Sequence, residues 1–176
     1  AILRASIRSL RFNTDPSAFT ELFKIKSNRK LLDNEDLSAE YFYALGQHGD
    51  LKAQRYLIQG LKPIGRQSKA LKARILALGR MRDARSVDAL IKYLHKGNRG
   101  RRHRGDAHVA LVVLTGEDPG NQPREWADWW RDHKKGFRVA KEPGDVPKRQ
   151  AKSWDKVWVD PDAPKPAKRK KGRGKK

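Results

Sequence analysis

Hydrophobic residues in the middle of the chain recur with the spacing of an amphipathic helix. Leu71, Ile75 and Leu78 follow one another at intervals of four and three residues, which places them on one helix face. Gly79 is expected to end this helix in a left-handed conformation. After it, Asp83 can accept hydrogen bonds from the free N–H groups that open a second helix. The inward positions of that helix are Val87, Leu90, Ile91 and Leu94.

This helix pair returns along the chain at a nearly constant interval. Residues 44–50 align with residues 77–83, and the four turn aspartates, spaced by 35, 33 and 35 residues, are Asp15, Asp50, Asp83 and Asp118. In the first and last copies a proline follows the aspartate, where its missing N–H costs nothing. A single pair cannot bury its apolar face, so such units must stack. The sequence therefore predicts an all-α fold, a short right-handed α-solenoid of about four helix pairs in residues 1–136.

Two segments resemble a known repeat family. Residues 77–94, ALGRMRDARSVDALIKYL, resemble the short bacterial HEAT-like repeat, also called the PBS-lyase-type HEAT repeat. Residues 114–130, LTGEDPGNQPREWADWW, resemble the terminal element of many bacterial HEAT-repeat proteins, in which an LTG turn precedes a Trp-bearing helix. The resemblance covers residues 40–135 well and residues 1–35 weakly. It implies an all-helical repeat fold and a protein that binds other macromolecules, although fold alone is a weak guide to function.

The C-terminal residues depart from the repeat pattern. Residues 137–150 contain Pro and Gly and predict a linker, and residues 151–176 form a Trp-bearing arm followed by a basic, low-complexity tail. We expect an extended arm that docks through Trp154 and Trp158, either back onto the solenoid or onto a partner. The tail has no large apolar residue after Val159, so it cannot bury enough surface to offset its ordering entropy. Alone in solution we expect the tail to be mobile.

Charge adds a functional direction to this picture. The 176 residues include 41 Lys and Arg against 20 Asp and Glu, a net charge of +21, which attracts polyanions. Residues 61–105 hold 14 basic and 2 acidic side chains, and residues 146–176 hold 12 and 3. The absence of cysteine excludes disulfides, thiolate catalysis and cysteine-ligated metals. No apolar run approaches the length of a membrane-spanning helix, so membrane insertion is not expected.

The basic residues of the middle block and of the tail are the candidate anion-binding residues. The segment 97–105, GNRGRRHRG, carries four arginines, whose planar forks bind phosphate or carboxylate groups. The candidates in the solenoid are Lys69, Lys72, Arg85, Lys92, Lys96, Arg99, Arg101, Arg102 and Arg104. Those in the tail, expected to make non-specific contacts, are Lys168, Arg169, Lys170, Lys171 and Arg173.

Other chemistry finds less support in the sequence. Trp126, Trp129 and Trp130 are expected to seal the end of the solenoid. The alternatives are a docking patch or, by analogy with HEAT-like DNA glycosylases, a site combining Trp126 with Asp128 or Asp132. A metal site at His103, Asp106 and His108 is disfavoured because these residues do not share one helix face and have arginine neighbours. We expect no metal, no cofactor and no enzymatic activity.

The sequence thus predicts a non-enzymatic scaffold or accessory subunit that binds an anionic macromolecule, foremost an acidic protein or protein complex, and no small-molecule substrate. The alternative is a protein that binds DNA or RNA without sequence specificity, through the basic solenoid face and the tail. The first residue, Ala1, fits removal of a leader and export to the periplasm, which we favour slightly; otherwise we expect a cytoplasmic protein.

Overall fold

The computed structural model describes residues 2–62, 68–96, 102–139, 144 and 148–163. Within these ranges every regular element is helical and no strand occurs, as the sequence predicts. The α-helices are α1 (Ile2–Phe12), α2 (Pro16–Lys24), α3 (Arg29–Leu32), α4 (Glu35–His48), α5 (Gln54–Gln59), α6 (Ser68–Leu78), α7 (Ala84–Leu94), α9 (Arg104–Thr115), α10 (Pro123–His133) and α11 (Lys148–Trp158). A short 3-10 helix, η1 (Leu51–Ala53), precedes α5.

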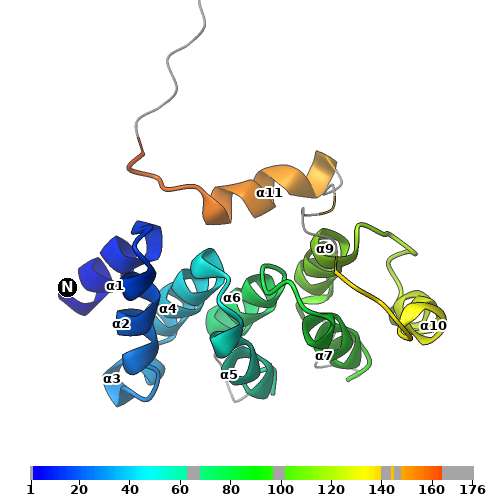
Figure 1. The fold of residues 1–176 in the computed structure, drawn as a ribbon, viewed down its shortest axis with the longest axis horizontal. Coiled ribbons are helices and arrows are strands. Elements are labelled where there is room, and N and C mark those ends of the chain that lie inside the picture. Colours follow the sequence, from blue (N-terminus) through cyan, green and yellow to red (C-terminus); the bar gives the residue numbers. More distant parts are fainter. Residues whose placement is uncertain (1, 63–67, 97–101, 140–143, 145–147, 164–176) are drawn as a thin grey trace, which may run out of the picture.

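The helices follow one another in a row from α1 to α10 (Figure 1). In the upper layer of this view α1 packs on α4, α4 on α6, and α6 on α9. In the lower layer α5 lies beneath α6, and α7 lies beneath α9. Helix α11 lies on the side of the upper layer that faces away from α5 and α7, and it runs above α4, α6 and α9.

Aspartate side chains begin three of the helices, which confirms their predicted capping role. Asp15, Asp50 and Asp83 each accept a hydrogen bond of 2.8 Å from the backbone N–H two residues later. The prediction for Asp118 is wrong, because its carboxylate lies 2.7 Å from His108 Nε2 and caps no helix. Helix α10 begins further along, at Pro123, where Gln122 and Glu125 form a reciprocal capping box.

The apolar positions predicted for the third helix pair form part of the core. Leu71, Ile75 and Leu78 of α6 are buried, as are the four inward positions of α7, Val87, Leu90, Ile91 and Leu94. Full burial of each such side chain contributes about 1.5–3 kcal/mol. The prediction that Gly79 is left-handed is wrong, since positive φ angles among the described residues occur at Gly49, Gly116, Gly120 and Gly136. Gly79 instead allows two elements to approach closely, as described below.

The Trp-bearing arm is helical, whereas an extended arm was expected. Helix α11 begins at Lys148, inside the segment 137–150 expected to be a linker. Its apolar residues Trp154, Val157 and Trp158 are spaced by three and one, so they share one face of a helix. Packing of this face against the helix stack accounts for the helical conformation.

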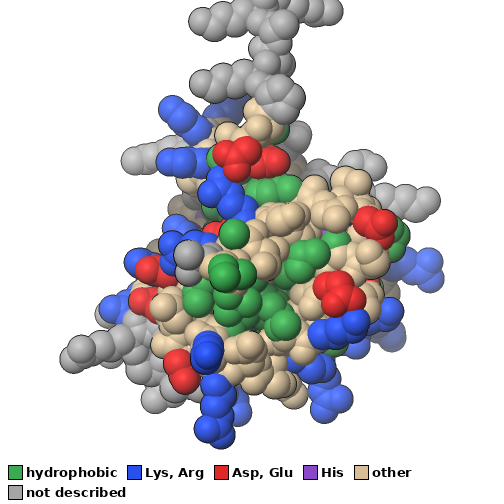
Figure 2. Space-filling view, turned by 90° about the vertical axis from the view of Figure 1, so that its left-hand side faces the viewer, with side chains coloured by type: hydrophobic (Ala, Val, Ile, Leu, Met, Phe, Trp, Pro, Cys, Tyr) green, Lys and Arg blue, Asp and Glu red, His purple; other side chains and the backbone are tan. Residues whose placement is uncertain are grey.

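The end of the row formed by α1 and α2 presents a hydrophobic patch edged by charged side chains (Figure 2). Ile2 in α1 is 85% exposed. Between α2 and η1 lies a cavity of about 360 Å³, lined by Phe19, Thr20, Phe23, Lys24, Lys26 and Lys52. None of the described helices is both long enough and apolar enough to cross a bilayer.

Candidate functional site

Four of the predicted anion-binding residues form ion pairs within the chain. Lys69 Nζ lies 2.7 Å from Asp36, and Lys72 Nζ lies 3.2 Å from Asp106. On α7, Arg85 Nε lies 2.9 Å from Asp83, and Lys92 Nζ lies 2.6 Å from Asp88. Each of these cations therefore already has a counter-charge.

The pKa values of the paired groups reflect these contacts. The hydrogen bond from Lys69 lowers the pKa of Asp36, and the same contact raises the pKa of Lys69. Burial alone would raise the pKa of Asp88, but hydrogen bonds from Lys92, Trp130 and Lys134 outweigh it and lower the pKa to about 2. Asp88 therefore joins α7 to α10 as a carboxylate.

The remaining predicted cations differ in their surroundings. Lys96 and Arg102 are exposed, and no acidic side chain of the described residues pairs with them. Arg104 is half-buried, and its Nε has no hydrogen-bond partner. Seven candidates lie outside the described residues: Arg99, Arg101, Lys168, Arg169, Lys170, Lys171 and Arg173.

A group of exposed cations in the segment around α5 was missed by the sequence analysis. Lys52, Arg55 and Lys62 are exposed, and within the described part of the chain none has an acidic partner at ion-pair distance. The charge count did not single out Lys52 and Arg55, because residues 1–60 hold 9 basic and 7 acidic side chains and look nearly neutral. Lys62 lies in the basic block 61–105, but it was not among the candidates chosen there. Only the pairing seen in the structure distinguishes free cations from neutralised ones.

Both tryptophans of α11 dock on the protein's own helices. Trp154 and Trp158 are only 8% and 7% exposed. A Cβ added at Gly79 would lie 2.8 Å from Trp154 Cη2 and 2.9 Å from Ala110 Cβ. Helix α11 therefore covers the grooves that α6 forms with its neighbours.

Arginine side chains hold the C-terminal end of α11. Arg11 Nη2 donates to the carbonyl of Val157, and Arg11 Nη1 lies 3.1 Å from Glu40. The guanidinium carbon of Arg80 lies 4.9 Å from the ring centroid of Trp158, a cation–π contact. The last carbonyls of a helix carry partial negative charge, so Arg11 also favours this helix end electrostatically.

The other tryptophan cluster packs at the α10 end. Trp126 and Trp130 are buried, and Trp130 Nε1 donates to Asp88 at 3.0 Å. Asp128 and Asp132, considered with Trp126 as a glycosylase-like site, both pair with Arg131 at the surface. These contacts account for the cluster as packing between α7 and α10.

The histidines considered for metal binding occupy separate networks. His103 Nδ1 lies 2.9 Å from Asp106, whereas His108 Nε2 lies 2.7 Å from Asp118. Ser68 Oγ lies 3.1 Å from His103 Nε2, so hydroxyl, imidazole and carboxylate form a chain that the sequence analysis did not detect. Lys72 contacts the other carboxylate oxygen of Asp106, and the network ties the start of α6 to the start of α9.

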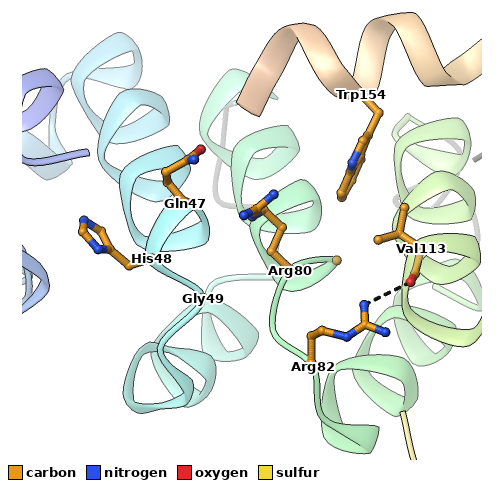
Figure 3. Close-up of a pocket in the computed structure, with 8 residues that line it drawn as sticks. Gln47, His48, Gly49, Arg80, Arg82, Val113 and Trp154 are labelled. Atoms are coloured by element: carbon orange, nitrogen blue, oxygen red, sulfur yellow. Dashed lines mark hydrogen bonds between the residues drawn. The ribbon is translucent and has the colours of Figure 1, made fainter. Parts of the chain in front are cut away.

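A cavity opens beside α11, where the ends of α4 and α6 meet α9 (Figure 3). Its volume is about 240 Å³, and its lining residues are Gln47, His48, Gly49, Gly79, Arg80, Arg82, Val113 and Trp154. Arg80 Nε donates to Gly46 O at 3.0 Å, and Arg82 Nη1 donates to Val113 O at 3.2 Å. The cavity thus contains two guanidinium groups, and none of the described residues that line it is acidic.

Comparison with known protein families identifies one repeat in the middle of the chain. The model of the PBS lyase HEAT-like repeat matches residues 75–96, which include the C-terminal part of α6, the turn at Asp83 and all of α7. A search of curated proteins found no match. The matched region contains the turn aspartate and the buried α7 positions from which the resemblance was inferred. The resemblance is confirmed at this position: the chain contains a PBS lyase HEAT-like repeat.

Proposed function

We propose that this protein is a short right-handed HEAT-like solenoid that serves as a scaffold or accessory subunit for an anionic protein partner and acts by binding rather than by catalysis. The HEAT-like repeat supports a role in macromolecular interaction. The observation that carries the choice of an anionic partner is a group of exposed cations whose side chains have no described acidic partner at ion-pair distance, Lys52, Arg55 and Lys62. An exposed cation with no internal partner can contribute its charge to a complex.

The proposed binding set extends beyond these three residues. Lys96 and Arg102 belong to it because they too have no described acidic partner. The arginines of segment 97–101 and the basic tail are proposed as further charge contacts, which would raise the effective concentration of the partner. Lys69, Lys72, Arg85 and Lys92 are proposed to contribute less, because each would have to leave an existing ion pair.

A protein partner is favoured over nucleic acid because apolar surface accompanies the free cations. Lys26 and Lys52 line the same cavity as Phe19 and Phe23, whose rings stack with centroids 5.5 Å apart. A hydrophobic patch lies on the end face formed by α1 and α2 (Figure 2), and Ile2 of α1 is exposed. Protein interfaces combine apolar contact with charge, whereas non-specific binding to a phosphate backbone depends on charge.

Two triple variants test this proposal. Lys52→Gln/Arg55→Gln/Lys62→Gln removes three unpaired charges, and Lys69→Gln/Arg85→Gln/Lys92→Gln removes three paired ones. The net charge of both variants is the same. In nuclease-treated native extract at moderate salt, we expect the first variant to lose a discrete protein that the wild type and the second variant retain.

The opposite results have defined meanings. Equal retention by both variants would exclude the α5 cations as the contact surface. Loss of all bound material after nuclease treatment, with log affinity falling linearly against log salt, would replace the protein partner by nucleic acid. A chain truncated before α11 is less suitable for this assay, because it would expose the surface that Trp154 and Trp158 cover.

A further inference from the structure

The cavity beside α11 contains a cation, Arg80, that has no acidic partner among the described residues. No acidic side chain in the described part of the chain pairs with Arg80. Its Nε donates to Gly46 O, and its guanidinium stacks on Trp158, but neither contact neutralises the charge. Burial, followed by the charge of Arg11, lowers the pKa of Arg80. A partly buried, unpaired charge costs free energy that an anion in the cavity would recover.

A second polar side chain in the same cavity also lacks a partner. The side-chain oxygen of Gln47 is buried and accepts no hydrogen bond. Gln47 from α4 and Arg80 from the turn after α6 face the same space (Figure 3). A half-turn of the amide exchanges its oxygen and its NH2 group, so Gln47 can also present a donor to an anion.

The size and walls of the cavity select the kind of anion. Its volume of about 240 Å³ leaves room for a short side chain. Val113 and Trp154 supply apolar wall, while Arg80 and Gln47 supply polar groups. Arg82, which donates to the carbonyl of Val113, is a second basic residue in the described lining. A carboxylate joined to a short methylene stem satisfies all three conditions, since a planar guanidinium matches a planar carboxylate.

We propose that this cavity receives a glutamate side chain of the acidic protein partner, with its carboxylate on Arg80 and its methylene groups against Val113 and Trp154. This inference rests on the proposed function, because it names the group by which the partner is recognised. It adds a specific contact to the diffuse attraction of the α5 cations. The partner is thus expected to present a glutamate at the edge of the stack where α4 and α6 end.

Propionate, which reproduces the end of a glutamate side chain, tests the cavity directly. It is titrated into the full-length protein at constant ionic strength, with chloride as the balancing ion. The readout is the indole N–H signal of Trp154 in a two-dimensional ¹⁵N NMR spectrum, assigned by its loss in Trp154→Phe. We expect a saturable shift whose dissociation constant rises about tenfold or more in Arg80→Gln. Arg124→Gln, at a side chain that is 91% exposed and outside the proposed binding set, is the control and should titrate like the wild type.

Several results would overturn the proposal. These are a shift that does not saturate, an equal response in Arg80→Gln, and saturation by phosphate but not by propionate, which would point to a phosphate group instead. The other four indole signals report whether Arg80→Gln is folded. If it is not, Arg80→Lys and Gln47→Leu replace it, and both must weaken propionate binding. If propionate fails while the α5 cations still retain a protein partner, the cavity assignment falls and the proposed function stands.

Discussion

Trp154 and Gly79 pack so closely that only a hydrogen atom fits between the indole and the backbone. A Cβ at Gly79 would lie 2.8 Å from Trp154 Cη2. The same relationship recurs 33 residues earlier, where a Cβ at Gly46 would lie 2.9 Å from Trp158 Cη2 and 2.7 Å from Ala77 Cα. The two tryptophans, four residues apart on α11, thus contact glycines at corresponding positions of two aligned sequence segments.

Gly79→Ala should destabilise the protein because the added methyl group meets both Trp154 and the backbone of Ala110, at 2.8 and 3.0 Å. Backbone cannot yield as a flexible side chain does, so we expect a loss of about 1–3 kcal/mol in the free energy of unfolding. Urea denaturation provides the measurement. Gly105→Ala is the control: nothing lies within 4 Å of its added Cβ, and alanine is the better helix former, so stability should stay equal or rise. Equal stability of Gly79→Ala and the wild type would contradict the packing described.

Trp158→Ala should release α11 without unfolding the stack. The change removes a buried ring that contacts Tyr43 edge-on, with centroids 6.0 Å apart, and takes away the cation–π partner of Arg80. Loss of a buried tryptophan costs about 3–5 kcal/mol. We expect this loss to weaken the docking of α11 rather than the packing of the other helices. Hydrogen exchange should show faster exchange in α11 while α6 and α9 stay protected. Val159→Ala, at a 61% exposed position, is the control. Equal deprotection of α6 would show instead that α11 is needed for the fold itself.

The all-helical fold and the HEAT-like repeat at residues 75–96 were predictable because local and long-range signals agree there. At Asp50 and Asp83, the residue that caps a helix also ends a hydrophobic pattern of the right period, so the helix pair can be read from neighbouring residues. At Asp118 the same local pattern gave a wrong prediction of a helix cap. Its sequence context is the same as that of Asp15, Asp followed by Pro, but His108 lies 2.7 Å from it and occupies its carboxylate. A contact across ten residues overrides the local preference.

Arg11→Met should weaken the attachment of α11 to α1 and leave Glu40 without its partner. The Arg11 side chain is only 7% exposed, and removing one member of a buried ion pair costs about 3 kcal/mol. The matched control is Arg8→Met, one turn earlier, which breaks an exposed pair with Asp162 at 3.0 Å and should cost less than about 1 kcal/mol. Urea denaturation of both variants checks the difference. Similar losses for the two would argue against a buried role for Arg11.

Asp88→Asn should reduce stability in a pH-dependent way. The pKa of Asp88 is about 2 in the folded protein, below the ordinary 3.8. The ionised carboxylate therefore stabilises the fold fully at pH values above 3.8. That contribution, about 2 kcal/mol, is lost as the pH falls through the folded-state pKa. We therefore expect a difference from the wild type near pH 7 that shrinks toward pH 2 in urea unfolding. Asp132→Asn, at an exposed pair, is the control. A constant difference across this pH range would show that the effect does not come from ionisation.

The candidate binding surface was less accessible to sequence reasoning than the fold. Composition identified the middle block as basic, but it could not show that Lys69 meets Asp36, which lies 33 residues away. It also gave no reason to single out Arg55, whose surroundings in the sequence look neutral. The cavity around Arg80 depends on α11 returning across the stack, a docking that the sequence left open between the chain itself and a partner. Charge can be counted from a sequence, but its neutralisation depends on the fold.

The path of α11 across the upper layer also has a mechanical consequence. A stack of repeats bends through small rotations at the joint between each pair of neighbours. Trp158 lies at the joint of α4 with α6, and Trp154 lies at the joint of α6 with α9, so one helix braces two consecutive joints on the same side. These three helices should therefore move as a rigid block. The orientation of α4, α6 and α9 relative to one another is thus held by a helix that follows all three in the sequence.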